Sequence, residues 1–145
     1  MFTVGVFQDV EWADRGLSAL MTDGFAVESV TIVARASPEA SSLIERHLGR
    51  APDQLDVSGL GPAVVCGPLI ETLQGSDDGL RARGLSRTFG RAGFQAHDGH
   101  IYETLVGRGG VLVALKSQPR AADALATLHA YGGGNAAIGV WAGRL

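Results

Sequence analysis

The sequence predicts one α/β domain of the α+β type: a ferredoxin-like, split βαβ sandwich with a helical insertion between its two βαβ halves. A strand–helix–strand pattern fills residues 1–34, and the same pattern returns in residues 110–145. The stretch 35–109 between them is far longer than an ordinary connection and must carry structure of its own. We therefore expect the two halves to form the sheet and the insertion to be helical. A doubly wound parallel sheet is the alternative that strand patterns leave open.

The first half has clear boundaries. Residues 2–7 are apolar and β-rich, and Asp9 follows as a helix N-cap. Apolar residues then recur at helical spacing up to Gly24, which ends the helix. Residues 27–34 form the second predicted strand.

The insertion begins with a helix. Ser37 and Pro38 are typical of a helix start, and Gly49 closes that helix. The polar, turn-rich residues 50–59 are the best candidate for a mobile loop, and the apolar run 60–70 is twice interrupted by Gly-Pro.

The rest of the insertion is predicted to be helical. Pro68 occupies the first turn of a helix that ends near Gln74, and a helix over 77–91 is broken at Gly84. Asp98 caps a last helix that runs to Gly107. These three helices complete the insertion.

The second half repeats the plan of the first. Residues 110–116 form a strand, Ser117 and Pro119 open a helix, and the glycines 132–134 stop it before a final strand over 136–141. The strand 110–116 is apolar on both of its alternating faces, so both faces of the sheet must be covered. Either the insertion or a second subunit can cover the second face. We expect a homodimer with the insertion contributing to its interface.

Composition limits the function. The chain has 145 residues, 46% of them hydrophobic, and a net charge of −3, which argues against nucleic acid or anionic lipid as its main partner. Cys66 is the single cysteine, so no intramolecular disulfide can form and a reducing, cytoplasmic location is expected. The amino terminus lacks the pattern of a signal peptide, and no stretch is apolar enough for a membrane span.

Small residues at several positions point to a known family. Gly5 within the first strand, the Gly61-Pro62 and Gly67-Pro68 pairs, Tyr102, and the Gly-Gly-Val-Leu-Val run at 109–113 are the residues concerned. This pattern resembles the small bacterial general-stress, or heat-induced stress, protein domain family. The resemblance implies a ferredoxin-like domain with a stress-associated binding or interaction role and no established catalytic activity.

One polar cluster is a candidate site. His97, His100 and Glu103 recur every three residues beside Tyr102, and two imidazoles with a carboxylate could ligate a transition metal. In the alternative interpretation Asp98 caps the helix while His100 and Glu103 are solvated. We predict no bound metal and no cofactor.

An arginine stripe is the second candidate. Arg83, Arg87 and Arg91 are spaced for one helical face, which could hold an anionic small molecule or a protein partner. A solvated face partly balanced by Asp77 and Asp78 is the alternative. The glycine-rich stretches match no nucleotide-binding motif.

Three hypotheses for the function follow. The first is a non-catalytic binding or interaction module, the second a small-ligand-binding regulatory domain, and the third an enzyme that uses the histidine cluster. An interaction module should expose an apolar patch, and a ligand-binding domain should show a pocket with convergent polar groups. An enzyme should have titratable groups with shifted pKa values in that pocket.

Overall fold

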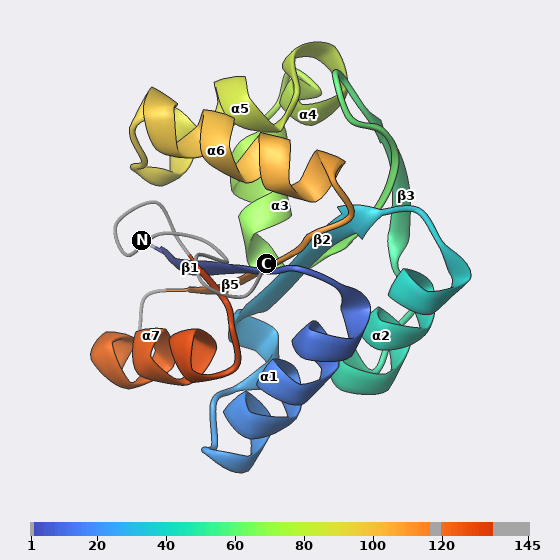
Figure 1. Cartoon of the computed structure of the whole chain (residues 1–145). Helices are drawn as coiled ribbons and strands as arrows, with labels where there is room; N and C mark the ends of the chain where they lie inside the picture. Colours follow the sequence, from blue (N-terminus) through green and yellow to red (C-terminus); the bar gives the residue numbers. More distant parts are fainter. Residues whose placement is uncertain (1, 117–119, 135–145) are drawn as a thin grey trace.

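A computed structural model describes residues 2–116 and 120–134 of the chain (Figure 1). The elements in chain order are β1 (Phe2–Phe7), α1 (Val10–Thr22), η1 (Val27–Ser29), β2 (Val30–Arg35), α2 (Pro38–Leu48), β3 (Asp53–Val57), β4 (Gly61–Cys66), α3 (Pro68–Gln74), α4 (Gly79–Arg83), α5 (Leu85–Thr88), η2 (Phe89–Ala92), α6 (Ala96–Gly107), β5 (Val111–Lys116) and α7 (Ala121–Ala130). The predicted mixture of helices and strands, an α+β fold, is confirmed.

Within these residues, five strands form one sheet in the order β1-β5-β2-β4-β3, and every neighbouring pair is antiparallel. Strand β5 lies between β1 and β2, with Val113 opposite both Gly5 and Ile32. The unit β1-α1-β2 is therefore a split βαβ, and β1 pairs with β5, as expected for two halves that share one sheet.

The second split unit cannot be followed to its end, because the predicted strand 136–141 lies outside the described residues. The chain that follows α7 pairs with the outer edge of β1. There the Val6 N–H donates to the Gly134 carbonyl at 2.8 Å, and the Gly134 N–H donates back at 3.1 Å. The name ferredoxin-like stays a prediction for the whole chain.

The insertion differs from the sequence prediction, because it is not only helical. Strands β3 and β4 extend the sheet beyond β2, and β3 occupies the stretch 50–59 that we expected to be a mobile loop. The reason is that β3 is an edge strand in which Val57 alone is fully buried. Its polar composition resembles that of a loop, although its backbone pairs along its whole length with β4.

Helices cover both faces of the sheet (Figure 1). Helices α1, α2 and α7 pack on one face and the segment α3 to α6 packs on the other, each over its own hydrophobic cluster. The insertion therefore covers the second face from within the same chain. A second subunit is not needed for that purpose, which removes the argument on which the homodimer was predicted.

Most helix ends follow the predicted capping. The Asp9 side chain accepts from the Trp12 N–H at 2.9 Å, and the Ser37 hydroxyl accepts from the Ala40 N–H at 3.0 Å. Helix α6 is an exception: it begins at Ala96, so Asp98 lies in its first turn and is not the cap. No helix in the described ranges is long and apolar enough to cross a membrane.

The segment 77–91 is broken at Gly84, as predicted, and forms the three short pieces α4, α5 and η2. Gly84 has a φ of 93°, and a Cβ at this position would collide with the carbonyl oxygen of Ser58. Only glycine combines this backbone conformation with such close packing.

Candidate functional site

Four of the seven predicted site residues line one depression, which we call the polar hollow. Its volume is about 390 Å³, and it lies between the α4–α5 segment and α6. The residues that line it are Ser58, Gly59, Ala82, Arg83, Ser86, Arg87, His100 and Glu103. The arginine stripe and the histidine cluster, predicted as separate candidates, therefore meet at one place.

Close contact between α5 and α6 builds this hollow. A Cβ on Gly99 would lie 2.7 Å from the Ser86 carbonyl oxygen and 3.0 Å from the Phe89 Cβ, so glycine allows the two backbones to touch. The Ser86 N–H donates to the Glu103 carboxylate at 3.3 Å. These contacts fix the backbone on both sides of the hollow.

The cationic groups of the hollow have few partners. Arg83 approaches Asp77 only to 3.7 Å. In the described part of the chain, the exposed side chains of Arg87 and His100 make no hydrogen bond or ion pair. A guanidinium group suits a carboxylate or a phosphate, so these groups can receive an anion from outside the chain.

Arg91 has a different role from the rest of the stripe. It donates to both carboxylate oxygens of Asp77 at 2.7 Å, and to the Leu73 carbonyl at 3.0 Å. The hydrogen bonds from Arg91 lower the pKa of Asp77, and the same pair raises the pKa of Arg91. Arg91 therefore holds the end of α3 against η2 and does not line the polar hollow.

The histidine cluster is also divided. His97 is exposed in the first turn of α6, outside the hollow. Tyr102 is buried, with its ring 5.2 Å from that of Phe89 in an edge-on contact at 88°. Among the residues with described positions, no group of three or more His, Cys, Asp or Glu side chains could hold a metal ion. The residues considered as candidate metal ligands are thus not assembled into one group.

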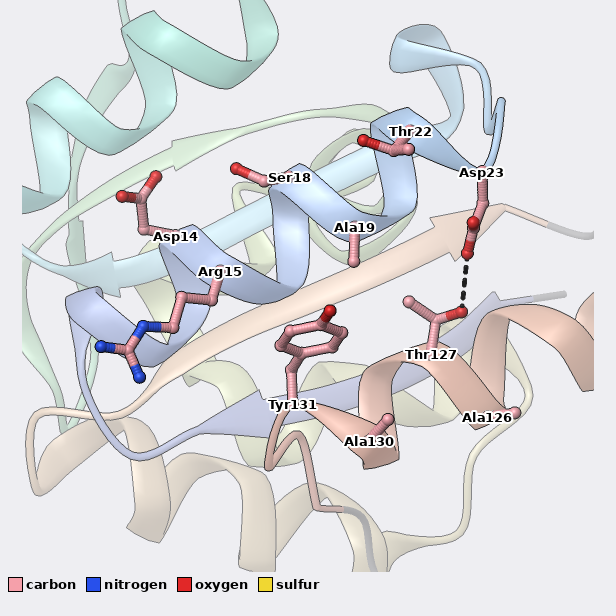
Figure 2. A pocket seen from close by; sticks show the side chains of 10 residues that line it. All are labelled: Asp14, Arg15, Ser18, Ala19, Thr22, Asp23, Ala126, Thr127, Ala130 and Tyr131. Carbon is pink, nitrogen blue, oxygen red and sulfur yellow. Dashed lines mark hydrogen bonds between the residues drawn. The ribbon is translucent and has the colours of Figure 1, made fainter.

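A second and larger depression, the α1–α7 groove, was not predicted (Figure 2). It has a volume of about 660 Å³ and lies between α1 and the end of α7, where the Tyr131 ring extends toward Ala19. Its lining consists of Asp14, Arg15, Ser18, Ala19, Thr22, Asp23, Ala126, Thr127, Ala130 and Tyr131. No local sequence signal marks it, because it depends on the contact between two helices far apart in the chain.

The charged groups of the α1–α7 groove already have partners. Asp14 accepts from His47 at 2.6 Å and from Arg46 at 2.8 Å, and these hydrogen bonds lower the pKa of Asp14. Arg15 pairs with Glu11 at 3.0 Å. The Asp23 carboxylate, the third charged group of the groove, accepts a hydrogen bond from the Thr127 hydroxyl at 3.1 Å, which is drawn as a dashed line in Figure 2. The groove therefore offers mainly hydroxyl groups and small apolar side chains.

The shifted pKa values do not point to either depression as a catalytic centre. Those of Asp14, Asp77 and Arg91 arise from ion pairs, and Asp77 and Arg91 do not line the polar hollow. Comparison of the chain with protein-family models, with curated proteins and with solved structures found no match.

Proposed function

We propose that this protein is a binding domain that holds a small anion, such as a phosphate or carboxylate group, in the polar hollow. The observation that carries the proposal is the convergence of Arg83, Arg87 and His100 from three helices, with Arg87 and His100 lacking a partner in the described structure. The hydroxyl groups of Ser58 and Ser86 add neutral donors to the same lining.

The other hypotheses have less support. Among the described residues, the large hydrophobic side chains that are exposed are those of Val27 and Tyr131, which do not amount to an apolar patch. Catalysis would need titratable groups tuned within the hollow, and the ion pairs above do not supply them. The stress-associated role implied by the family resemblance stays a prediction, as do the homodimer and the cytoplasmic location.

Glu103 restricts what the hollow can accept. Its carboxylate lines the same hollow as the cations and repels an approaching anion, although it accepts a hydrogen bond from the Ser86 N–H. A singly charged anionic group on the Arg87 side is therefore favoured over a compact, highly charged anion. A hydroxyl or amino group on the same ligand could donate to Glu103.

Titration with inorganic phosphate below its second pKa, where it carries a single negative charge, followed by amide chemical shifts, tests the proposal. The variant Arg87→Gln should lower phosphate affinity about ten- to a hundredfold, because a charge-assisted hydrogen bond contributes about 1.5–3 kcal/mol. The matched control is Arg81→Gln, which removes an exposed arginine on the same segment that pairs with Asp78 at 3.1 Å and lies outside the hollow. Phosphate affinity should be unchanged in the control.

The substitution Glu103→Gln should change the phosphate affinity in the opposite direction in the same titration. The amide oxygen can still accept from Ser86, while the negative charge is removed, so phosphate affinity should rise. Equal losses in Arg87→Gln and Arg81→Gln would mean that phosphate responds only to total charge. That result, or no shift of amides around the hollow, would reject the proposed function.

A further inference from the structure

We propose that the outer edge of β3 binds an extended, basic peptide segment, which adds a strand to the sheet and places one apolar side chain beside α3. This inference is independent of the anion site. Among the described residues, strand β3 ends the sheet order and pairs with β4 on one side only. By contrast, the outer edge of β1 already pairs at Val6 with Gly134.

The register shows which backbone groups of β3 face outward. The Ala36 N–H donates to the Pro62 carbonyl at 3.0 Å, so the backbone groups of Pro62 face β2. Asp56 is opposite Pro62, and Gln54 is opposite Val64, two residues further along β4. In an antiparallel pair of strands, two opposite residues point their N–H and C=O groups either toward each other or both away from each other, and these two arrangements alternate along the strands. Pro62 and Val64 point theirs toward β2, so the residues opposite them on β3 point theirs away from β4. The N–H and C=O groups of Gln54 and Asp56 therefore face outward and are available to another strand.

An apolar depression lies beside this edge, and we call it the edge hollow. Its volume is about 340 Å³, and Leu55, Val65 and Ile70 supply its apolar lining between β3 and α3. Alternate side chains of an added strand would lie on this face of the sheet. One of them could extend over Leu55 into the edge hollow, which would give the peptide an anchor in addition to its backbone bonds.

The acidic side chains at this edge favour a basic partner. Asp53, Asp56 and Glu71 are all exposed at this edge, and Asp53 and Glu71 line the edge hollow, which has no basic residue in its lining. A second copy of the chain paired through β3 would bring the aspartates of both copies together, which is unfavourable. A segment with lysine or arginine on either side of an apolar residue complements the edge.

A synthetic peptide of about six residues, the usual length of a strand, tests the inference. It alternates lysine and threonine around a leucine, and a second peptide carries glutamate in place of lysine. With the full chain, the basic peptide should slow amide hydrogen exchange at Gln54 and Asp56. The acidic peptide should leave exchange at these positions unchanged.

Two substitutions at one position separate edge pairing from simple charge attraction. Gln54→Pro removes an outward N–H and keeps the ladder with β4, since proline is tolerated where its missing N–H faces solvent. Gln54→Thr keeps the N–H. The proline variant should bind the basic peptide about tenfold more weakly, the size expected for loss of one hydrogen bond and its local geometry. The threonine variant should bind it with unchanged affinity.

A charge-matched pair of variants keeps the inference testable if Gln54→Pro unfolds. The double substitution Asp53→Asn, Asp56→Asn should weaken binding of the basic peptide, and Glu39→Gln, Glu45→Gln on α2 should not. Equal weakening in both double variants would overturn the inference. It would also be overturned by protection of β1 in place of β3, or by concentration-dependent protection of β3 without peptide, which would identify a second copy as the occupant.

Discussion

The two helical layers cover the same sheet in different ways. On one face, α1 and α2 have 13 and 11 residues and begin at side-chain caps. On the other face, α6 has 12 residues, but α3, α4 and α5 have only 7, 5 and 4, and none of these four helices begins at a side-chain cap. Both layers bury a continuous apolar cluster. One long helix and several short ones therefore suffice to cover a sheet face, and the short ones bring more chain turns to the surface.

The charges follow the same division. In the regular layer Asp14 joins α1 to α2 through His47 and Arg46. In the irregular layer the break at Gly84 places Arg83 and Arg87 on separate pieces, and Arg87 has no partner in the described structure. The arginines of α1 and α2 are paired with carboxylates, whereas the irregular layer leaves Arg87 open to a ligand.

The largest expected effect tests whether the irregular layer is as firmly packed as the regular one. Phe89 is fully buried and contacts the rings of Phe94 and Tyr102. We expect Phe89→Ala to lower the free energy of unfolding by about 3–5 kcal/mol, measured by urea denaturation. Phe7→Ala is the matched substitution of a fully buried phenylalanine in the other cluster and should cost a similar amount. A loss of less than about 1 kcal/mol at Phe89 alone would show that the second layer is loosely packed.

A smaller effect separates stability from binding. Gly99 lies where α6 touches α5, and Gly16 lies where α1 touches the ring of Phe7. Alanine at either position overpacks the interface, so each variant should lose about 1–3 kcal/mol, partly offset by the higher helix propensity of alanine. Only Gly99→Ala should also weaken phosphate binding, because it displaces Ser86 and the adjacent Arg87. Equal phosphate affinity in both variants would contradict the assignment of the polar hollow.

The smallest effect concerns pH. Hydrogen bonds from His47 and Arg46 lower the pKa of Asp14 in the folded state. The stabilisation from this shift is therefore present above the ordinary carboxyl pKa and is lost as pH falls through the lowered value. Because the Asp14 side chain is 39% exposed, we expect Asp14→Asn to cost less than about 1 kcal/mol at neutral pH. Urea denaturation of both proteins from neutral to acidic pH should show this difference shrinking at the acid end.

The regular layer could be predicted from sequence more fully than the irregular one. The caps at Asp9 and Ser37 and the apolar spacing between them and the closing glycines are local signals, and they located α1 and α2. Strand β3 was not predicted because an edge strand needs few apolar residues, so its sequence resembles that of a loop. The start of α6 was missed because Asp98 suits the first turn as well as the cap.

The candidate site shows the same limit. Arg83 and Arg87 are close in sequence, so both line the polar hollow although the helix is broken at Gly84. Arg91 instead forms hydrogen bonds with Asp77. Their meeting with His100 depends on how α6 packs on α5, which no local pattern encodes. The α1–α7 groove was missed for the same reason.

The middle position of β5 has a consequence for the order of assembly. As the chain leaves the ribosome, β1 is made early, yet its neighbour in the sheet follows only after the whole insertion. Strands β2, β4 and β3 can form a hairpin-like subassembly during that interval, while β1 has no described strand to join until β5 arrives. Such a high contact order slows folding and leaves β1 exposed on the nascent chain.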